Sequence, residues 1–290
     1  MTRAEATARA LVASSLLLAI WCGTATAGAD ESDDKLACDR TRHLGLLDGP
    51  ALIGIAEGDL GMGHRACPRS EVAIGVRGGA IIDLPAFYGA FGITTHVDGS
   101  FAFKKRFEVS ASLEIVDYQY AQNTSIKGNS VGLGDLSLAA SVIAYHGRKL
   151  AITPYGRVLF PTNTIAANER TFGGEVGLAA EVRPLASGRL AVSGFLGGVM
   201  TGAASAGPAF LRGGAIGSVG LQYSPWIWLG IAANLSVSLG QRAVLDHIAP
   251  SGALRFRLWR TLSLELAVLV PVAGADRHDL AFGLGIHYRF

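Results

Sequence analysis

The chain has 290 residues, of which half are hydrophobic and 17% are charged, with a formal net charge of +2. An average soluble protein has about 25% charged residues, so this chain is unusually apolar. The balanced charge provides no broad basic surface of the kind that binds nucleic acid, and we exclude nucleic acid as a partner. The length suits one large all-β domain with a short appendage.

Residues 1–27 have the features of an export signal. Two arginines precede an apolar core at 11–21, and small residues ending at Ala27 form a cleavage site. A core of about eleven residues is too short to span roughly 30 Å of hydrocarbon, which argues against an uncleaved anchor. Cys22 raises the alternative of a lipoprotein, but lipid attachment requires a small residue before the cysteine, and Trp21 stands there.

Removal of the signal leaves two cysteines, Cys38 and Cys67, in an oxidising compartment where a disulfide persists. Both precede the first convincing strand pattern. We therefore expect residues 28–70 to form a periplasmic N-terminal segment, rich in Asp, Gly and Pro and closed by a Cys38–Cys67 bridge. Two unpaired thiols in a loose tail are the alternative.

Apolar residues alternate with small or polar ones from Glu71 onward, most clearly at the end of the chain. The apolar positions there are Leu280, Phe282, Leu284, Ile286, Tyr288 and Phe290. A helix would scatter these side chains around its circumference, whereas a strand places all of them on one face. The ranges 107–115 and 262–270 repeat the pattern.

The alternation predicts about twelve strands in residues 71–290, an even number as in outer-membrane barrels. They are expected at 71–81, 86–103, 107–120, 132–146, 149–162, 171–183, 189–203, 209–223, 226–239, 249–258, 261–271 and 278–290. Tight connectors alternate with longer polar ones, which is typical of short periplasmic turns and longer external loops. The predicted fold is all-β: a transmembrane antiparallel up-and-down β-barrel in the bacterial outer membrane.

Two other architectures fit less well. A soluble barrel needs a well-charged outer face, but the polar positions are mostly Gly, Ala, Ser and Thr, which suit a lumen. The uncharged stretch 190–211 has small-residue spacings typical of a membrane helix. However, the run of Gly, Ala, Ser and Pro at 202–208 indicates a hairpin turn in its middle.

Two resemblances support the barrel. The last strand, with apolar residues at alternate positions up to Tyr288 and the terminal Phe290, resembles the signal that outer-membrane barrels present to their assembly machinery. The segment 132–138 (GLGDLSL), with the strand opening at 106–109 (RFEV), resembles a barrel family linked to aromatic-compound degradation by the phenol meta-pathway. That second resemblance implies passage of small molecules, but only through the association of that family with such transport. Outer-membrane lipid and the assembly machinery are the expected partners.

Inward-facing charges are the candidate functional residues, because charge rings set selectivity in a pore. The candidates are Arg255, Arg257, Asp135, Glu108, Glu114, Arg157 and Glu175. We expect Arg255 and Arg257 on one strand face to be the main selectivity element, followed by Asp135, which could equally be a turn residue. The alternative is a network of ion pairs that only satisfies a narrow lumen.

The expected function is therefore a passive pore or transporter for small solutes. A sealed structural or adhesive barrel that acts through its external loops is the alternative, since twelve strands lie between filled eight-stranded and open sixteen-stranded barrels. A lipid-modifying barrel enzyme is less favoured, because no histidine has a serine two residues away on a strand. We expect no cofactor, and no ligand-spaced cluster predicts a metal site.

Overall fold

The computed structural model describes residues 36–39, 65–83, 88–122, 127–162, 164, 171–185, 187–203, 212–240, 245–274 and 280–290. The predicted export signal and most of the N-terminal segment lie outside the described residues, so those predictions remain expectations. Among the residues that the structure describes, no helix is long and apolar enough to cross a membrane.

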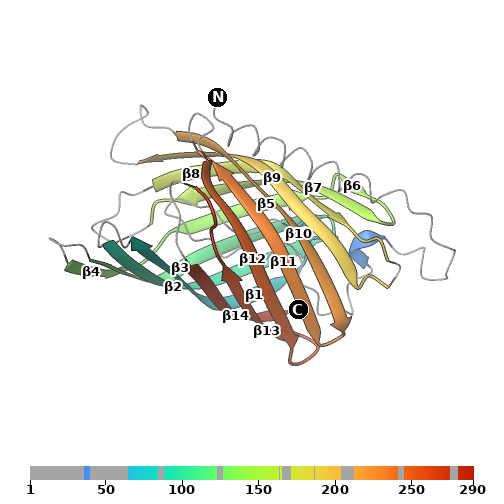
Figure 1. Cartoon of the computed structure of the whole chain (residues 1–290). Coiled ribbons are helices and arrows are strands. Elements are labelled where there is room, and N and C mark those ends of the chain that lie inside the picture. Colours follow the sequence, from blue (N-terminus) through green and yellow to red (C-terminus); the bar gives the residue numbers. More distant parts are fainter. Residues whose placement is uncertain are drawn as a thin grey trace.

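Strands account for nearly all of the described chain (Figure 1). The strand segments are β1 (Glu71–Asp83), β2 (Tyr88–Phe103), β3 (Phe107–Gln122), β4 (Lys127–Gly132), β5 (Leu136–Val142), β6 (Tyr145–His146), β7 (Leu150–Phe160), β8 (Thr171–Val182), β9 (Leu190–Ala203), β10 (Arg212–Trp226), β11 (Leu229–Leu239), β12 (Leu245–Arg257), β13 (Leu262–Leu269) and β14 (Leu280–Arg289). A short 3-10 helix, η3 (Ala37–Asp39), precedes them.

The sheet is a closed antiparallel barrel in which sequential strands are neighbours. β1 pairs with β2 on one side and with β14 on the other, where Glu71 lies opposite Arg289 and Ala80 opposite Leu280. The segments β4, β5 and β6 follow one another along one path between β3 and β7. Counted as one strand, they reduce the fourteen described segments to twelve barrel strands. The predicted fold class is confirmed.

The predicted strand positions agree with the structure, with differences at the ends. The strand predicted at 132–146 begins earlier, at Lys127, and is interrupted at 133–135. The strand predicted to begin at 249 begins at Leu245. The helix considered for 190–211 is excluded over Leu190–Ala203, which form β9, because neighbouring strands satisfy its backbone hydrogen bonds.

The two faces of the wall follow the alternation in the sequence. On β14, the exposed fraction of Leu284 is 45% and that of Ile286 is 52%. Ala281, which lies between the apolar Leu280 and Phe282 in the sequence, is fully buried. β3 changes phase once: Ile115 has no partner on β2, so that Glu114 and Asp117 both face inward. The exposed apolar face is the one that meets lipid in a membrane barrel, and the inner face lines the lumen.

One end of the barrel carries the short connections, at 104–106, 147–149, 183–189, 227–228 and 258–261, and also the C-terminus. We call this the tight-turn end. Lys104 and Lys105 adopt positive φ angles of 48° and 56°, the backbone form that a tight two-strand connection requires. Trp226 and Trp228 stack there with ring centroids 5.2 Å apart, as expected for an aromatic girdle at a membrane interface.

Candidate functional site

The described parts of the N-terminal segment lie against the inner wall at the tight-turn end. A disulfide joins Cys38 to Cys67, with the Cα atoms 5.3 Å apart, as the sequence led us to expect. Ala37 and Ala66 are buried and share an apolar cluster with Phe195 of β9. The segment therefore occupies lumen space near the place where the wall strands turn.

Polar contacts fix the segment to the wall. The Arg65 guanidinium lies 3.2 Å from the Glu108 carboxylate (Nε to Oε1) and donates to Ser100 Oγ at 2.9 Å. Thr153 Oγ1 donates to the carbonyl of Ala66 at 2.6 Å. Each partner is an inner-face residue of β2, β3 or β7, so three wall strands hold the segment.

Arg69 adds further attachments next to β1. Its backbone N–H donates to Glu108 Oε2 at 2.8 Å, and its guanidinium lies 3.2 Å from Glu71 Oε2. Desolvation by burial, and then the charge of Arg289, lower the pKa of Arg69 to about 9, while the Glu71 carboxylate opposes them. The guanidinium is therefore charged at neutral pH, and its ion pair with Glu71 persists.

A second charged network lies where the first and last strands meet. Glu71 on β1 lies 2.7 Å from His287 Nδ1 on β14, and His287 Nε2 lies 3.4 Å from Glu265 on β13. Arg255 on β12 donates to the same carboxylate, with Nε 2.9 Å from Glu265 Oε2. We call these four residues the seam network, because they connect β12, β13, β14 and β1 across the closure of the barrel.

The predicted selectivity residues, Arg255 and Arg257, have different partners in the structure. Arg255 is 6% exposed and ion-paired with Glu265. The Arg257 side chain instead donates to the backbone carbonyls of Trp259 and Arg260 in the next turn, at 3.2 and 3.0 Å. The two arginines therefore have different contacts: register brings a carboxylate to Arg255, while Arg257 lies close enough to the turn to cap it. Their role in selectivity stays a prediction.

Two other predicted residues also form an ion pair. Arg157 on β7 lies 3.6 Å from Glu175 on β8, and both side chains are almost completely buried. Tyr155 donates its hydroxyl to the same carboxylate at 2.6 Å. A buried pair of this kind is costly to break, because one charge would be left uncompensated.

Glu114 and Asp135 meet at the break between β4 and β5. Gly134 N–H donates to the Glu114 carbonyl at 3.0 Å, and Glu114 N–H donates to the Asp135 carbonyl at 3.3 Å. A side chain at Gly134 would clash with Glu114, since an added Cβ would lie 2.4 Å from its Cβ. Asp135 therefore sits in an irregular connection within one strand, and its role in selectivity stays a prediction.

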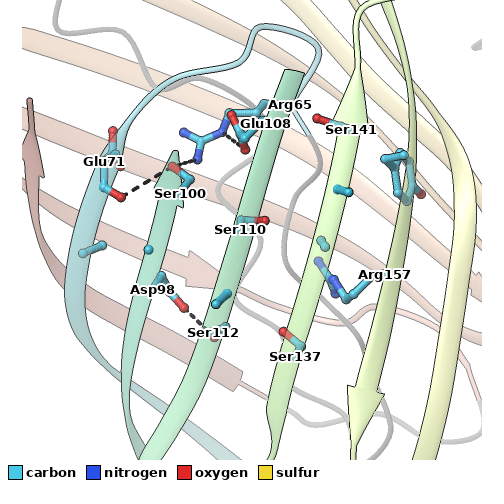
Figure 2. A pocket seen from close by; sticks show the side chains of 16 residues that line it. Arg65, Glu71, Asp98, Ser100, Glu108, Ser110, Ser112, Ser137, Ser141 and Arg157 are labelled. Atoms are coloured by element: carbon cyan, nitrogen blue, oxygen red, sulfur yellow. Dashed lines mark hydrogen bonds and ion pairs between the residues drawn. The ribbon is translucent and has the colours of Figure 1, made fainter. Parts of the chain in front are cut away.

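A polar cavity of about 90 Å³ lies on the inner wall between the N-terminal segment and Arg157 (Figure 2). Serines on three neighbouring strands line it, and we call it the serine pocket. Its serines are Ser100, Ser110, Ser112, Ser137 and Ser141. Arg65, Glu108 and Arg157 border the same cavity, and these three already belong to the ion pairs described above.

The inner wall of β9 to β12 differs from this charged region. Among the described residues of these strands, the deeply buried polar side chains other than Arg255 are uncharged. They include Ser193, Gln222, Asn234, Ser236 and Ser251. Ser193, Asn234 and Ser251 lie on one row across four strands, with Gly220 between the first two. In the part of the chain that the structure describes, the charged groups of the lumen thus gather on the side of β1, β3, β7, β8 and the seam.

Sequence reasoning missed the part that the N-terminal segment plays inside the lumen. Arg65, Arg69 and Glu71 were not among the candidates, although all three contribute ion pairs there. The sequence feature that could have identified them is the position of Arg65 and Arg69 on either side of Cys67, whose disulfide restrains this stretch. Among the described residues, no group of three or more His, Cys, Asp or Glu side chains is arranged to hold a metal ion.

The assembly residues lie where the resemblance implied, at the outer edge of the tight-turn end. Phe290 is 62% exposed, and its ring stacks near Tyr288 with centroids 6.4 Å apart. Both side chains point away from the lumen, on the apolar face of β14. Their use as an assembly signal stays a prediction.

No protein-family model matches this sequence, and no curated protein matches it. Solved structures do match. An outer membrane channel from Pseudomonas putida F1 aligns with a TM-score of 0.60 at 11% identity, over 77% of this chain and 96% of that chain. The KdgM porin aligns with a TM-score of 0.51 at 14% identity, over 75% of this chain and 99% of that chain. A second structure of that porin is a complex with disordered oligogalacturonate.

At these identities the likeness concerns the fold. It is the closed twelve-stranded antiparallel barrel of porins and channels, and this chain has the architecture of a bacterial outer-membrane β-barrel.

Proposed function

We propose that this chain is a channel for small solutes in the outer membrane, described here in a closed form. The observation that carries the proposal is the position of residues 65–70 inside the barrel wall. They are held by hydrogen bonds and ion pairs to inner-face residues, notably Ser100, Glu108 and Thr153. Similarity in fold to porins and channels supports the same class of function.

The composition of the wall supports a channel that a separate segment closes. Inner-face positions carry many Gly, Ala and Ser residues, so wall side chains alone leave space in a barrel of this size. Ion pairs and hydrogen bonds can be exchanged for contacts with water at modest net cost. Withdrawal of residues 65–70 would therefore open space on the charged side of the lumen without disturbing the wall.

The identity of the solute depends on the residues that line the lumen. The resemblance to barrels linked to aromatic-compound degradation suggests a small aromatic solute, and the KdgM complex suggests a saccharide. We do not assign either from likeness alone, because fold does not determine function.

A sealed barrel is the second candidate, and one observation favours it. Glu181, Arg183, Gln222 and Ser224 are completely buried at the tight-turn end of the lumen. The Arg183 guanidinium pairs directly with Glu181, which also contacts the sulfur of Cys67. Permanent closure there would leave the external loops as the functional surface.

Single-channel recording in planar bilayers separates the two candidates. The double variant R65A/R69A removes both guanidinium groups that attach the segment to the wall, and we expect a several-fold rise in open time or conductance over the unaltered protein. The matched control R106A/R260A removes two arginines that are exposed in tight turns, and should behave as the unaltered protein.

The closed-channel proposal fails if folded protein never conducts. To make that test strict, the cysteines are also replaced by serine in the R65A/R69A background, so that neither the bridge nor the arginines retain the segment. A heat-modifiable, correctly folded barrel that still shows no conductance would favour the sealed barrel.

A further inference from the structure

The serine pocket has hydroxyl groups that the fold leaves unused. The side-chain hydroxyls of Ser110, Ser137 and Ser141 form no hydrogen bond with any residue that the structure describes, although all three residues border the cavity. Figure 2 shows them on neighbouring strands around the same space, with Arg157 at its border. Ser112 differs, because it donates to Asp98 at 2.5 Å.

Strand register explains the hollow. Ser110 on β3 lies opposite Ala139 on β5, and Ala139 lies opposite Arg157 on β7. A methyl group therefore stands between a hydroxyl and a guanidinium in one row across three strands. On either side of Ala139 along β5, Ser137 and Ser141 face inward as well, since inward positions alternate along a strand. The pocket is a gap of side-chain volume surrounded by polar groups.

The charges at the pocket are already paired with protein groups. Arg65 pairs with Glu108 at 3.2 Å, and Arg157 pairs with Glu175 at 3.6 Å. A charged solute would have to compete with one of these pairs in a partly buried site, which is costly. A neutral solute would meet no such competition. Serine hydroxyls both donate and accept hydrogen bonds, so they complement other hydroxyl groups.

The volume limits the size of the solute. A cavity of about 150 Å³ accommodates benzene, whereas this one measures about 90 Å³. It suits a molecule of a few heavy atoms, or one segment of a longer chain that passes through the lumen. Because the pocket is open on one side, a longer polyol such as erythritol can place one hydroxylated unit in it and leave the remainder outside.

We propose that the serine pocket binds a small neutral polyhydroxylated solute, or one polyol-like unit of it, through the hydroxyls of Ser110, Ser137 and Ser141. Arg65 and Arg157 form the two ends of the site. The inference deepens the proposed function, on which it rests for the route by which a solute reaches the pocket. Binding itself requires no conduction and can be measured separately.

Saturation-transfer difference NMR on the full chain folded in detergent measures this binding, with erythritol as the probe. Tartrate has the same number of carbons but carries two carboxylates, and it serves as the charged comparison. We expect a saturable signal for erythritol and a weaker one for tartrate. In the triple variant S110A/S137A/S141A, erythritol affinity should fall about ten-fold or more, because three hydrogen bonds are lost.

Two further variants make the result specific. The matched control S218A/S236A/S251A removes three hydroxyls from the inner face of β10 to β12, outside the pocket, and should retain erythritol binding. The variant A139L keeps every pocket hydroxyl but fills the hollow, and should abolish binding. Heat modifiability on gels verifies that each variant is folded.

Several results would overturn the proposal. They are tartrate binding more tightly than erythritol, equal loss in the triple variant and its matched control, unchanged binding in A139L, or no saturable erythritol signal in folded protein. Conductance separates this outcome from failure of the channel function. A protein that conducts ions but does not bind erythritol is a channel without this site, and one that binds erythritol without conducting has the site in a sealed barrel.

Discussion

The imidazole of His287 on the last strand lies 2.7 Å from the carboxylate of Glu71 on the first strand. The two residues are at opposite ends of the barrel sequence, and their contact spans the seam at which the wall closes. Glu265 approaches the other ring nitrogen of His287 at 3.4 Å, and Arg255 pairs with Glu265. The seam network therefore adds side-chain contacts to the backbone hydrogen bonds of the closing strands.

Removal of the Glu71 charge should weaken barrel closure. In the variant Glu71→Gln, Arg69 and His287 lose their carboxylate partner in a largely buried site, and such a loss costs about 3 to 5 kcal/mol. The temperature at which the folded band disappears on gels should fall clearly. Asp117→Asn, a change at an inward acid remote from the seam, is the control and should have a smaller effect. Equal shifts in both would mean that the seam network adds no specific stability.

The ion pair of Arg255 predicts an effect that can be reversed. Arg255→Glu places two carboxylates side by side and should lower the unfolding temperature. The charge-swapped variant R255E/E265R should recover much of that loss, because the pair is restored in the opposite sense. Arg257→Glu should change stability less, since the hydrogen bonds of Arg257 to the turn carbonyls are exposed to solvent. Ion selectivity measured on all three variants tests the pore role predicted for these arginines.

The orientation of the wall is tested at Leu284, which lies near the middle of β14 and is 45% exposed on the outer face. An arginine there should reduce the free energy of folding into lipid vesicles by about 2 to 4 kcal/mol, whereas Tyr288→Arg near the interface should cost about 0 to 1 kcal/mol. Urea titration of the folded fraction measures both. Tolerance of arginine at Leu284 would mean that this face does not meet lipid.

The terminal aromatic residue provides a test of assembly. Phe290→Asp should lower the amount of inserted barrel in cells strongly, because the proposed recognition signal is lost. The control Phe103→Asp changes another exposed phenylalanine at the same end of the barrel, 54% exposed against 62% for Phe290, but away from the C-terminus. Refolding into detergent, which requires no assembly machinery, should proceed similarly for the two variants. A similar loss in cells for both would leave no special role for Phe290.

Reduction of the Cys38–Cys67 bridge should affect conduction more than stability. Both cysteines lie outside the wall strands, so their bridge restrains the N-terminal segment and not the barrel. We expect C38S/C67S to raise open time while the unfolding temperature of the wall falls less than in Glu71→Gln. Unchanged currents, together with a large loss of stability, would contradict this division of roles.

The sequence by itself determined the strands and their two faces. Alternation is a local property: each residue of β14 faces lipid or lumen according to its place in a period of two, whatever its partners. The number of strands followed from counting such segments. Cys38 and Cys67 are the two cysteines that follow the predicted export signal, so their bridge could be predicted without a structure.

Only the tertiary structure decided which inner-face residues meet. Register between strands brings Glu265 to Arg255, and strand ends bring turn carbonyls to Arg257, although both arginines share one face in the sequence. The contacts of Arg65 with Ser100 and Glu108 link residues distant in the chain. Such contacts depend on how the closed wall is staggered and on what enters its lumen, and neither is encoded in a local pattern.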